Sequence, residues 1–410
     1  MNDLYFKNNI QKNYIKKTLK KNLSKKFTKV IENINFDILD QNKTLNILSQ
    51  KFKFNFSVDD LKRFKKFKSI AIIGMGGSIL GSEAIYKFLG SKIKKKFYFF
   101  DDLNTKKNSR FKKKKILKKI LFIIISKSGN TIETLSNVLS LKILEKNSKN
   151  IIIISEKKNN QLYLVSRKFN LFFIEHKKNI GGRFSVLSEV GAVPAHLMGV
   201  NIKKLRSSIL KPLKGKKKSF LKESTIKLTN LLNSKKIKNI IFLNYAPELE
   251  KFLFWYQQLL AESLGKNKKG FMPIISNVPK DHHSLLQLYL DGPKDKLFHI
   301  FSVNVNSKEK VFKNKALNEN NFLNNKNLNI IKNAQRYALI KTLKNKNIPF
   351  REFKINTISE SVIGELFSYF ILETILIGNL AKIDPYNQPA VEQVKILTKS
   401  LLSKKSKNYL

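Results

Sequence analysis

Short runs of apolar residues alternate with amphipathic segments through the middle of the chain. The predicted order of strand, glycine turn and helix begins at Ser69 with "SIAIIGMGGSILGSEAIYKFL" and returns in "KKILFIIISKSGNTIETLSNVLSLKIL". A third strand and helix follow in "KNIIIISEKKNNQLYLVSRKFN", and a fourth strand in "LFFIEH". Buried strands that alternate with helices are typical of a parallel sheet covered on both faces. The pattern therefore predicts a doubly wound α/β domain over residues 55–200.

A second round of the same pattern begins near Lys238. It contains "KNIIFLNYAPELEKFLFWYQQLLAESLG", "GFMPIISN" and "LLQLYLDGP", and it reaches the predicted strand "KLFHIFSVNV" near Lys296. We therefore predict a second α/β domain over residues 201–380. Apolar residues recur every three or four positions in residues 1–54, which indicates amphipathic helices. Residues 381–410 are expected to form a short polar tail with a turn at "DPYNQP".

Length and composition favour a cytoplasmic protein with more than one domain. The chain has 410 residues, and single cores rarely grow beyond roughly 250–300 residues. It contains no cysteine, which excludes disulfides and thiolate metal sites. No apolar core of a signal peptide follows the basic N-terminus. The most membrane-like segment, residues 364–381, carries two carboxylates, so we expect a buried helix of a soluble protein there.

The charge is strongly basic, with a formal net charge of +51. Such a charge suggests a nucleic-acid or anionic-membrane partner. The lysines, however, are scattered along the whole chain, and the densest run, "FKKKKILKK" from Phe111, has no interleaved aromatic residues. We therefore expect no specific nucleic-acid partner and no membrane partner. The basic field would still raise the association rate of an anionic substrate.

The turn after the predicted strand at residues 120–124 is rich in groups that bind anions. "ISKSGNT" places hydroxyls and an ammonium where a helix begins, and the helix dipole favours negative charge there. In an open α/β sheet, ligands bind beyond the carboxyl ends of the strands. The turn therefore predicts a site for a phosphate monoester. The side chains expected to bind it are Ser126, Lys127, Ser128 and Thr131.

A purely structural explanation covers part of this turn. Asn130 and Glu133 have the spacing of a capping box, and Gly129 permits a tight turn. This explanation leaves the two serines and the lysine without a role. The phosphate site is therefore the stronger hypothesis.

A glycine turn, "GMGGS", follows the preceding predicted strand. Its glycines, Gly77 among them, let the backbone approach a ligand, and Ser78 adds a hydroxyl at the start of the next helix. The dinucleotide pattern G-x-G-x-x-G is incomplete, because Ile79 stands where the third glycine would be. The turn therefore disfavours NAD and is compatible with a second contact to the same phosphate.

Six separated motifs resemble the glucose-6-phosphate isomerase family, whose members contain two sugar-isomerase (SIS) domains. They extend from about Ile70 to Lys395 and are "GMGGSILG", "SKSGNTIET", "GGRFS", "LLAESLGK", "DHHSLLQL" and "YNQPAVEQVK". The first two occur in many SIS proteins, and the last four, in that order, are more specific. The resemblance implies two tandem doubly wound SIS domains and a place in glycolysis and gluconeogenesis. It also implies isomerisation of glucose 6-phosphate and fructose 6-phosphate through an enediol, without metal or organic cofactor.

The resemblance assigns roles to individual residues. Glu262 corresponds to the base, and a helix over residues 249–264 would put it on one face with Trp255 and Leu259, where it would be partly desolvated. Arg183 corresponds to the arginine that stabilises the enediolate. The alternative for Glu262 is an exposed ion pair with Lys266 at i+4.

The resemblance also assigns the residues of ring opening and one further ligand contact. His283, identified by the following Ser284, and Lys395 correspond to the ring-opening pair, and Gln388 to a glutamine near the phosphate. Family members donate this histidine to the neighbouring subunit, which implies a homodimer with shared active sites. Asn179 and Asn387 replace aspartates of many members, so the local hydrogen bonding is expected to differ.

Two other hypotheses remain open from the sequence. An isomerase of this type could also accept mannose 6-phosphate. A non-catalytic SIS module that only binds sugar phosphates would have the phosphate turns without the glutamate, histidine and lysine set, and all three residues occur here.

Overall fold

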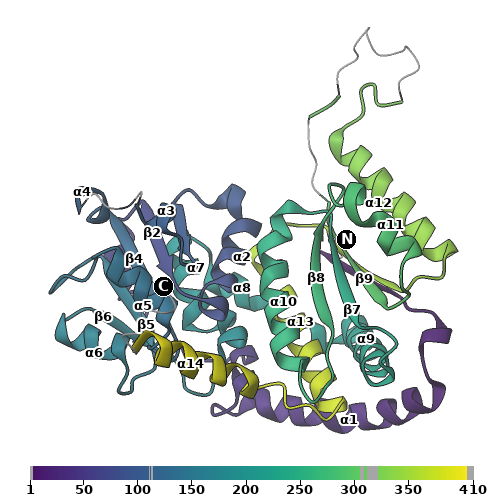
Figure 1. The fold of residues 1–410 in the computed structure, drawn as a ribbon, viewed down its shortest axis with the longest axis horizontal. Helices are drawn as coiled ribbons and strands as arrows, with labels where there is room; N and C mark the ends of the chain where they lie inside the picture. The colour runs from purple at the N-terminus through teal and green to yellow at the C-terminus, as the bar shows by residue number, and fades with distance from the viewer. Residues whose placement is uncertain (1–2, 110, 112–113, 305–308, 312–321, 404–410) are drawn as a thin grey trace.

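The computed structural model describes residues 3–109, 111, 114–304, 309–311 and 322–403. It consists of two α/β units, each built on a five-stranded sheet. Figure 1 shows the two units side by side, with helices α2 and α10 between their sheets. The mainly parallel α/β fold predicted from the alternating pattern is confirmed. The proposed domain limits, 1–54, 55–200, 201–380 and 381–410, stay a prediction.

The first sheet is entirely parallel, with the strand order β3-β2-β4-β5-β6. The strands are β2 (Ser69–Ile73), β3 (Lys96–Phe100), β4 (Ile120–Ile125), β5 (Ile151–Ser155) and β6 (Phe172–Glu175). Strand β4 is buried along its whole length, as its unbroken apolar run requires.

Helices cover both faces of the first sheet. Alternate residues of β2 point to opposite faces, so Ile70 and Ile72 contribute to one core and Ala71 and Ile73 to the other. The covering helices are α2 (Leu80–Phe88) and α7 (Glu189–Met198) on one face, and α4 (Lys114–Leu117), α5 (Ile132–Ser140) and α6 (Gln161–Lys168) on the other. The short helix α3 (Thr105–Ser109) follows β3.

The second sheet has the order β1-β10-β9-β7-β8 and is parallel except for its edge strand β1. Its strands are β1 (Leu4–Asn9), β7 (Asn239–Asn244), β8 (Met272–Asn277), β9 (Lys296–Val303) and β10 (Phe350–Ile355). The expectation that residues 1–54 form only helices is wrong for Leu4–Asn9. Leu4 and Phe6 face the core while Tyr5 and Lys7 face outward, which is the period of a strand.

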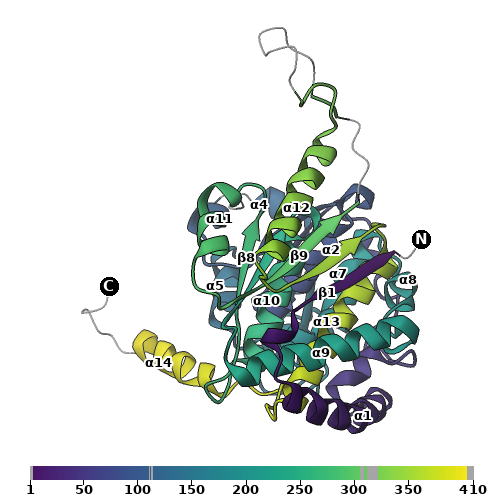
Figure 2. The same ribbon diagram turned by 90° about the vertical axis from the view of Figure 1, so that its right-hand side faces the viewer.

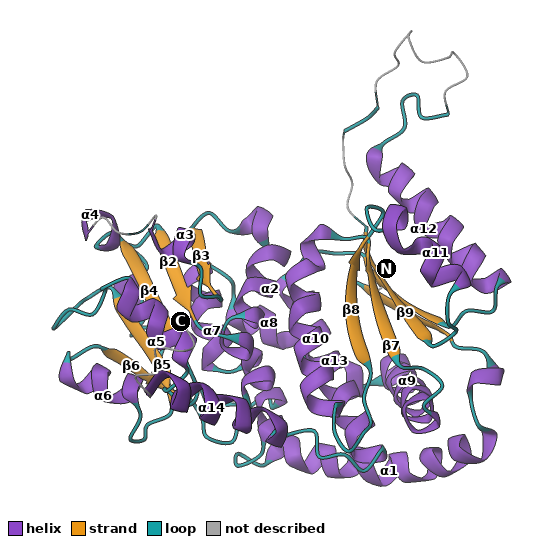
Figure 3. Ribbon diagram, viewed as in Figure 1, coloured by secondary structure: helices purple, strands orange, loops and turns teal. Residues whose placement is uncertain are grey.

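Helices also cover both faces of the second sheet, as Figure 3 shows. The helices on the face turned towards the first unit are α9 (Gly215–Ser234), α10 (Glu250–Leu264) and α13 (Glu360–Leu380). The outer face carries α11 (His282–Asp291) and α12 (Leu328–Asn345). Helix α1 (Lys17–Leu39) packs against α9 and α13, and α8 (Ile202–Ser207) packs against α13.

Helix α13 is the buried helix expected at residues 364–381. Among the described residues it is the single helix long and apolar enough to cross a membrane, and 94% of its apolar window lies buried inside the protein. Its two carboxylates have partners: Glu365 pairs with Lys217 and Glu373 with Arg351. The apolar sequence is therefore explained by the protein core that surrounds it.

The C-terminal segment differs from the expected polar tail, because α14 (Glu392–Ser403) is a regular helix. It has apolar side chains in solvent, including Val394 and Ile396, each 66% exposed, and Leu402, 70% exposed. Figure 2 shows this helix standing away from the body of the molecule.

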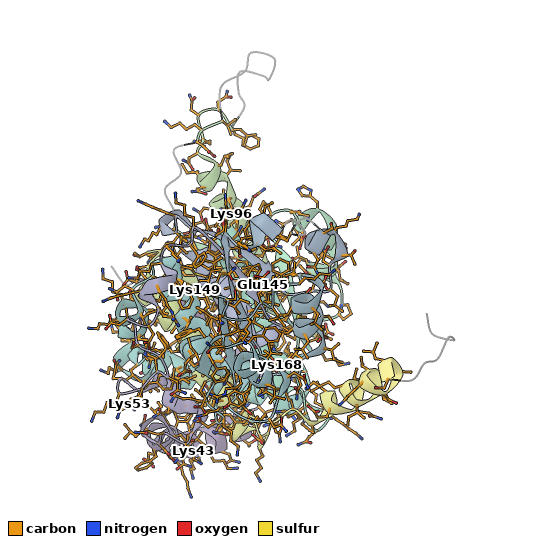
Figure 4. The ribbon with its side chains drawn as sticks, turned by 90° about the vertical axis from the view of Figure 1, so that its left-hand side faces the viewer. Lys43, Lys53, Lys96, Glu145, Lys149 and Lys168 are labelled. Carbon is orange, nitrogen blue, oxygen red and sulfur yellow. The ribbon has the colours of Figure 1, made fainter. Side chains whose placement is uncertain are left out.

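The five lysines labelled in Figure 4 are spread over the face that it shows. Figure 4 labels Lys43 and Lys53 near one end of the face it shows, Lys96 near the other end, and Lys149 and Lys168 between them. This spread agrees with the scattering along the sequence. Residues 112–113 of the densest basic run lie outside the described residues.

Candidate active site

Two turns lie at the carboxyl ends of neighbouring strands of the first sheet. Strands β2 and β4 pair in parallel, with Ile73 beside Ile124, so the glycine turn and the "ISKSGNT" turn emerge at the same edge. A side chain at Gly74 would meet the carbonyl oxygen of Ile125 at 3.0 Å. The two turns therefore adjoin, as expected for parts of one anion site.

Three hydroxyls form a cluster within the "ISKSGNT" turn. Ser126 Oγ lies 2.8 Å from Thr131 Oγ1, and Ser128 Oγ lies 3.5 Å from both. The backbone N–H of Gly129 donates to Ser126 Oγ at 3.1 Å, and Gly129 has φ +69°, which favours glycine. Three of the side chains that the sequence predicts to bind phosphate therefore lie together, and their binding of an anion stays a prediction.

The capping box expected from Asn130 and Glu133 is wrong. Thr131 is the residue that precedes α5, and no side chain caps that helix end. The Asn130 amide oxygen instead accepts from the backbone N–H of Gln161 at 2.9 Å. Helix capping therefore does not account for the polar side chains of this turn.

Lys127 contacts groups on the far side of the turn. Its ammonium donates to the carbonyl of Lys178 at 2.8 Å and lies 3.7 Å from Glu156 Oε1. Burial lowers the pKa of Lys127, and the nearby Glu156 counteracts this effect. An anion bound at the turn would compete with Glu156 for this ammonium.

Arg183 is the centre of a buried hydrogen-bond network. It lies in the 3₁₀ turn Gly182–Leu187 and is 3% exposed. Its guanidinium donates to side chains of Ser263 (2.9 Å), Glu262 (3.2 Å) and Gln388 (2.9 Å) and to the carbonyls of Pro385 (2.6 Å) and Asn387 (3.1 Å). Burial lowers its pKa, and Glu262 opposes that shift. The guanidinium therefore joins the GGRFS turn, α10 and the C-terminal loop.

Glu262 is held beside this arginine. One carboxylate oxygen accepts from Arg183, and the other accepts from Gln258 Nε2 at 2.8 Å. The side chain is 30% exposed, whereas Trp255 and Leu259 on the same helix are fully buried. The carboxylate thus lies at the border between the apolar core and solvent, with a fixed cation as its neighbour.

The alternative ion pair of Glu262 with Lys266 is wrong. The Lys266 ammonium donates to the carbonyl of Asp384 instead. Glu262 is consequently partnered by groups that orient it towards Arg183.

Sequence reasoning missed Gln258. It lies one helical turn before Glu262 and donates to its carboxylate. A side chain at Gly76 would come within 2.8 Å of Gln258 Nε2, so the glycine turn of the first unit touches this amide. The i,i+4 spacing from Glu262 on a predicted helix was the available signal.

Gly77 brings the glycine turn against the GGRFS turn. A side chain at Gly77 would meet the backbone of Gly182 at 2.2 Å, which no larger residue can tolerate. Ser185 Oγ also donates to the carbonyl of Gly77 at 3.3 Å. The predicted contact glycine therefore has a packing role that positions Arg183. Ser78, the last residue of this turn, is partly exposed.

A cavity of about 690 Å³ adjoins Glu262. Glu262, Lys266 and Asp384 line it together with Gln388 and its neighbours up to residue 391. No residue of the "ISKSGNT" turn lines this cavity. Asn387 contacts Arg183 through its backbone carbonyl, a contact that does not depend on the side chain at this position.

Comparison with known proteins decides the family. The sequence profile described as phosphoglucose isomerase matches residues 37–409, which is most of the chain. The chain belongs to the phosphoglucose isomerase family. The resemblance inferred from the six motifs is thereby confirmed, and the chain is an enzyme of the isomerase class.

Relatives match over most of their own length. Glucose-6-phosphate isomerase of Methanocaldococcus jannaschii is 34% identical over 352 residues, covering 83% of this chain and 86% of that protein. The same-named protein of Campylobacter jejuni is 30% identical over 380 residues, covering 88% and 90%.

Solved structures share the fold of this phosphoglucose isomerase family member. A hypothetical protein from Thermus thermophilus superposes with a TM-score of 0.79 at 22% identity, covering 97% of this chain and 100% of the other. A glucose-6-phosphate isomerase from Chlamydia trachomatis has a TM-score of 0.68 at 18% identity, covering 83% and 71%. These likenesses support the two-sheet α/β architecture.

His283 does not join Glu262 within this chain. It is exposed in the first turn of α11, on the outer face of the second sheet, whereas Glu262 lies on α10 on the inner face. The sheet therefore separates the two side chains, and Figure 1 shows their helices on different sides of it.

Lys395 is also apart from the Arg183 network. It lies on the exposed helix α14, where its ammonium is 2.8 Å from Glu392 one turn earlier. Its side chain is 59% exposed. Among the predicted catalytic residues, the folded chain thus brings together Arg183 and Glu262, with Gln388 beside them.

Proposed function

We propose that this chain interconverts glucose 6-phosphate and fructose 6-phosphate through an enediol intermediate. The observation that carries the proposal is the pairing of Glu262 with the buried guanidinium of Arg183, 3.2 Å apart. Isomerisation next to a carbonyl requires a base for the carbon-bound proton and a fixed positive charge for the developing enediolate. The family membership of the chain supports the same reaction.

In the proposed mechanism, Glu262 removes the proton from C2 of the open-chain aldose. The electrons of the broken C–H bond form the enediolate, whose negative oxygen is stabilised by Arg183. Glu262 then returns the proton to C1, and a proton moves from the C2 hydroxyl to the C1 oxygen, which yields the ketose. The reverse reaction follows the same path.

The phosphate group would bind at the two adjoining turns. Ser126, Ser128 and Thr131 supply clustered hydroxyls, and the glycine turn supplies backbone and Ser78. The Lys127 ammonium would move away from Glu156 and bind the phosphate dianion. Binding this non-reacting end of the sugar positions C1 and C2 for the base, so binding energy remote from the chemistry supports turnover.

A coupled assay tests the proposal directly. Fructose 6-phosphate is supplied, and formation of glucose 6-phosphate is followed through a dehydrogenase that reduces NADP. We expect sustained turnover by the purified chain without added metal or cofactor. Absence of turnover by folded protein in both directions would overturn it. The same assay format with mannose 6-phosphate decides whether that sugar is accepted.

We further propose a homodimer with shared active sites. Within one chain, His283 and Lys395 lie apart from Glu262. They would complete an active site only if each site took these two residues from the second copy. The exposed apolar side chains of α14 are consistent with a helix that a second copy covers. Because a two-fold interface uses the same surface on both copies, each copy would donate a histidine to the other.

Mixed dimers test the sharing of residues. Co-expression of Glu262→Gln with His283→Ala is expected to restore about a quarter of wild-type activity, because half of the dimers are mixed and each has one intact site. Each variant alone should be nearly inactive. The matched control co-expresses Glu262→Gln with Arg183→Lys. Arg183 and Glu262 of one chain belong to the same site, so each site of a mixed dimer has one defect and no activity should return. Equal results from both mixtures would contradict the shared site.

We place the enzyme in the cytoplasm, without a specific nucleic-acid or membrane partner. The absence of cysteine, the dispersed lysines and the buried position of α13 support this placement. The net positive charge would accelerate capture of the anionic sugar.

A further inference from the structure

A second cavity lies on the outer face of the second sheet, between α12 and the neighbouring strands β1 and β10. It has a volume of about 520 Å³, within the range of small-molecule sites. Figure 2 looks onto this side of the molecule, where β1 and α12 lie. The sheet separates this cavity from Glu262 on α10. The residues that line it are Tyr5, Lys7, Arg336, Tyr337, Ile340, Lys344, Glu352, Lys354 and Asn356.

Arg336 is the unusual residue of this cavity. It is 3% exposed, yet its guanidinium lies 3.7 Å from Glu352 Oε2, too far for a good hydrogen bond. Within the described part of the chain, its Nε has no hydrogen-bond partner. A buried guanidinium is costly unless its charge is well paired, and its carboxylate neighbour is 3.7 Å away, so an anion in the adjoining cavity would improve the pairing of Arg336.

The charge of the lining agrees with an anion. Lys7, Lys344 and Lys354 add three ammonium groups to Arg336, and Glu352 is the one acidic residue of the lining. Register places these groups together: Lys7 pairs with Glu352 and Tyr5 with Lys354 across the two strands, all on the outer face. One carboxylate therefore faces four cations.

Two tyrosines border the same cavity with much of their surface in solvent. Tyr5 is 47% exposed and Tyr337 is 57% exposed. The Arg336 guanidinium lies 4.4 Å from the centre of the Tyr337 ring, so cation and ring form one surface. Exposed aromatic rings beside cations suit a ligand that has both a flat ring and phosphate groups.

We propose that this cavity binds a nucleoside phosphate, with its base against the tyrosines and its phosphates on Arg336 and the lysines. A sugar phosphate alone would leave the tyrosine rings unused, and an apolar ligand would leave the cations unpaired. The inference is independent of the isomerase reaction, because none of its residues belongs to the catalytic network.

Calorimetric titration with ATP tests the proposal, with pyrophosphate and adenosine as separate probes of the two halves of the ligand. Lys344→Ala is expected to weaken ATP and pyrophosphate about tenfold, the worth of one charge-assisted hydrogen bond. Tyr5→Ala and Tyr337→Ala should weaken ATP about fivefold or more through lost stacking and leave pyrophosphate unchanged. Lys341→Ala, on the same helix outside the cavity, is the matched control and should change neither.

A further variant separates this cavity from the catalytic phosphate turn. Thr131→Val removes a hydroxyl of the "ISKSGNT" cluster and should leave ATP binding unchanged. The proposal fails if ATP does not bind, or if Lys344→Ala and Lys341→Ala weaken ATP binding equally. It fails as well if Thr131→Val, rather than Lys344→Ala, weakens ATP binding. It also fails if the tyrosine variants bind ATP as the wild type does.

Discussion

Replacing Glu262 with glutamine is expected to lower turnover by about 10²–10⁴-fold, the range of general acid–base catalysis. Glutamine has the shape of glutamate and still accepts a hydrogen bond from Gln258 or Arg183. It cannot accept the proton of the sugar carbon. Substrate affinity should change little, because in the proposed mechanism the phosphate binds at the two turns of the first unit and not at Glu262. Steady-state kinetics in both directions measure kcat and KM separately.

Glu223→Gln is the matched control for this prediction. Glu223 is a half-exposed carboxylate of α9 that pairs with Lys227 one turn later, and such surface pairs contribute little. Its replacement should leave kcat unchanged. A Glu262→Gln enzyme with nearly wild-type kcat would show that another group moves the proton.

Replacing Glu373 with leucine is expected to lower the free energy of unfolding by about 3–5 kcal/mol. Glu373 on α13 binds Arg351 on β10 through two hydrogen bonds of 2.6 and 3.1 Å, and both side chains are essentially inaccessible. Burial alone would lower the pKa of Arg351, but Glu373 raises this pKa above its usual value. Without this carboxylate, a charged guanidinium would remain in the core. Urea denaturation followed by circular dichroism measures the loss.

A double variant distinguishes an unpaired charge from simple loss of packing. Arg351→Met together with Glu373→Leu removes both charges, and we expect it to be more stable than Glu373→Leu alone. Tyr369, which donates to Glu373 at 2.7 Å, is present in both proteins. A double variant less stable than the single one would contradict the explanation by charge.

The local parts of the site could be predicted from the sequence because their signals lie within a few residues. The apolar run before "ISKSGNT" is a buried strand, and Ser126, Ser128 and Thr131 do meet, since a tight turn brings neighbours together. Helix α10 and the shared face of Trp255 and Leu259 follow from the period of 3.6 residues. The capping box does not form because the Asn130 side chain accepts a hydrogen bond from the backbone N–H of Gln161, at the start of another helix.

The remaining errors concern pairings between distant segments. Residues Leu4–Asn9 have the alternation of a strand, but a strand of this length gains stability only beside a partner, which here lies almost at the other end of the chain. A separate error concerns residues 392–403, because the prediction of a polar tail overlooked apolar residues at the spacing of a helix, Val394, Leu397 and Leu401.

By itself the sequence determined the α/β class, the two turns proposed to bind phosphate and the family, because short periods, turn residues and motifs are local properties. Only the tertiary structure decided that Arg183 joins Glu262 to Gln388, that His283 lies across a sheet from them, and that Lys395 stands on an exposed helix. These relations depend on which faces of two sheets pack together. Which faces pack together depends on the apolar surface buried over the whole chain, and this sum cannot be read from any short segment.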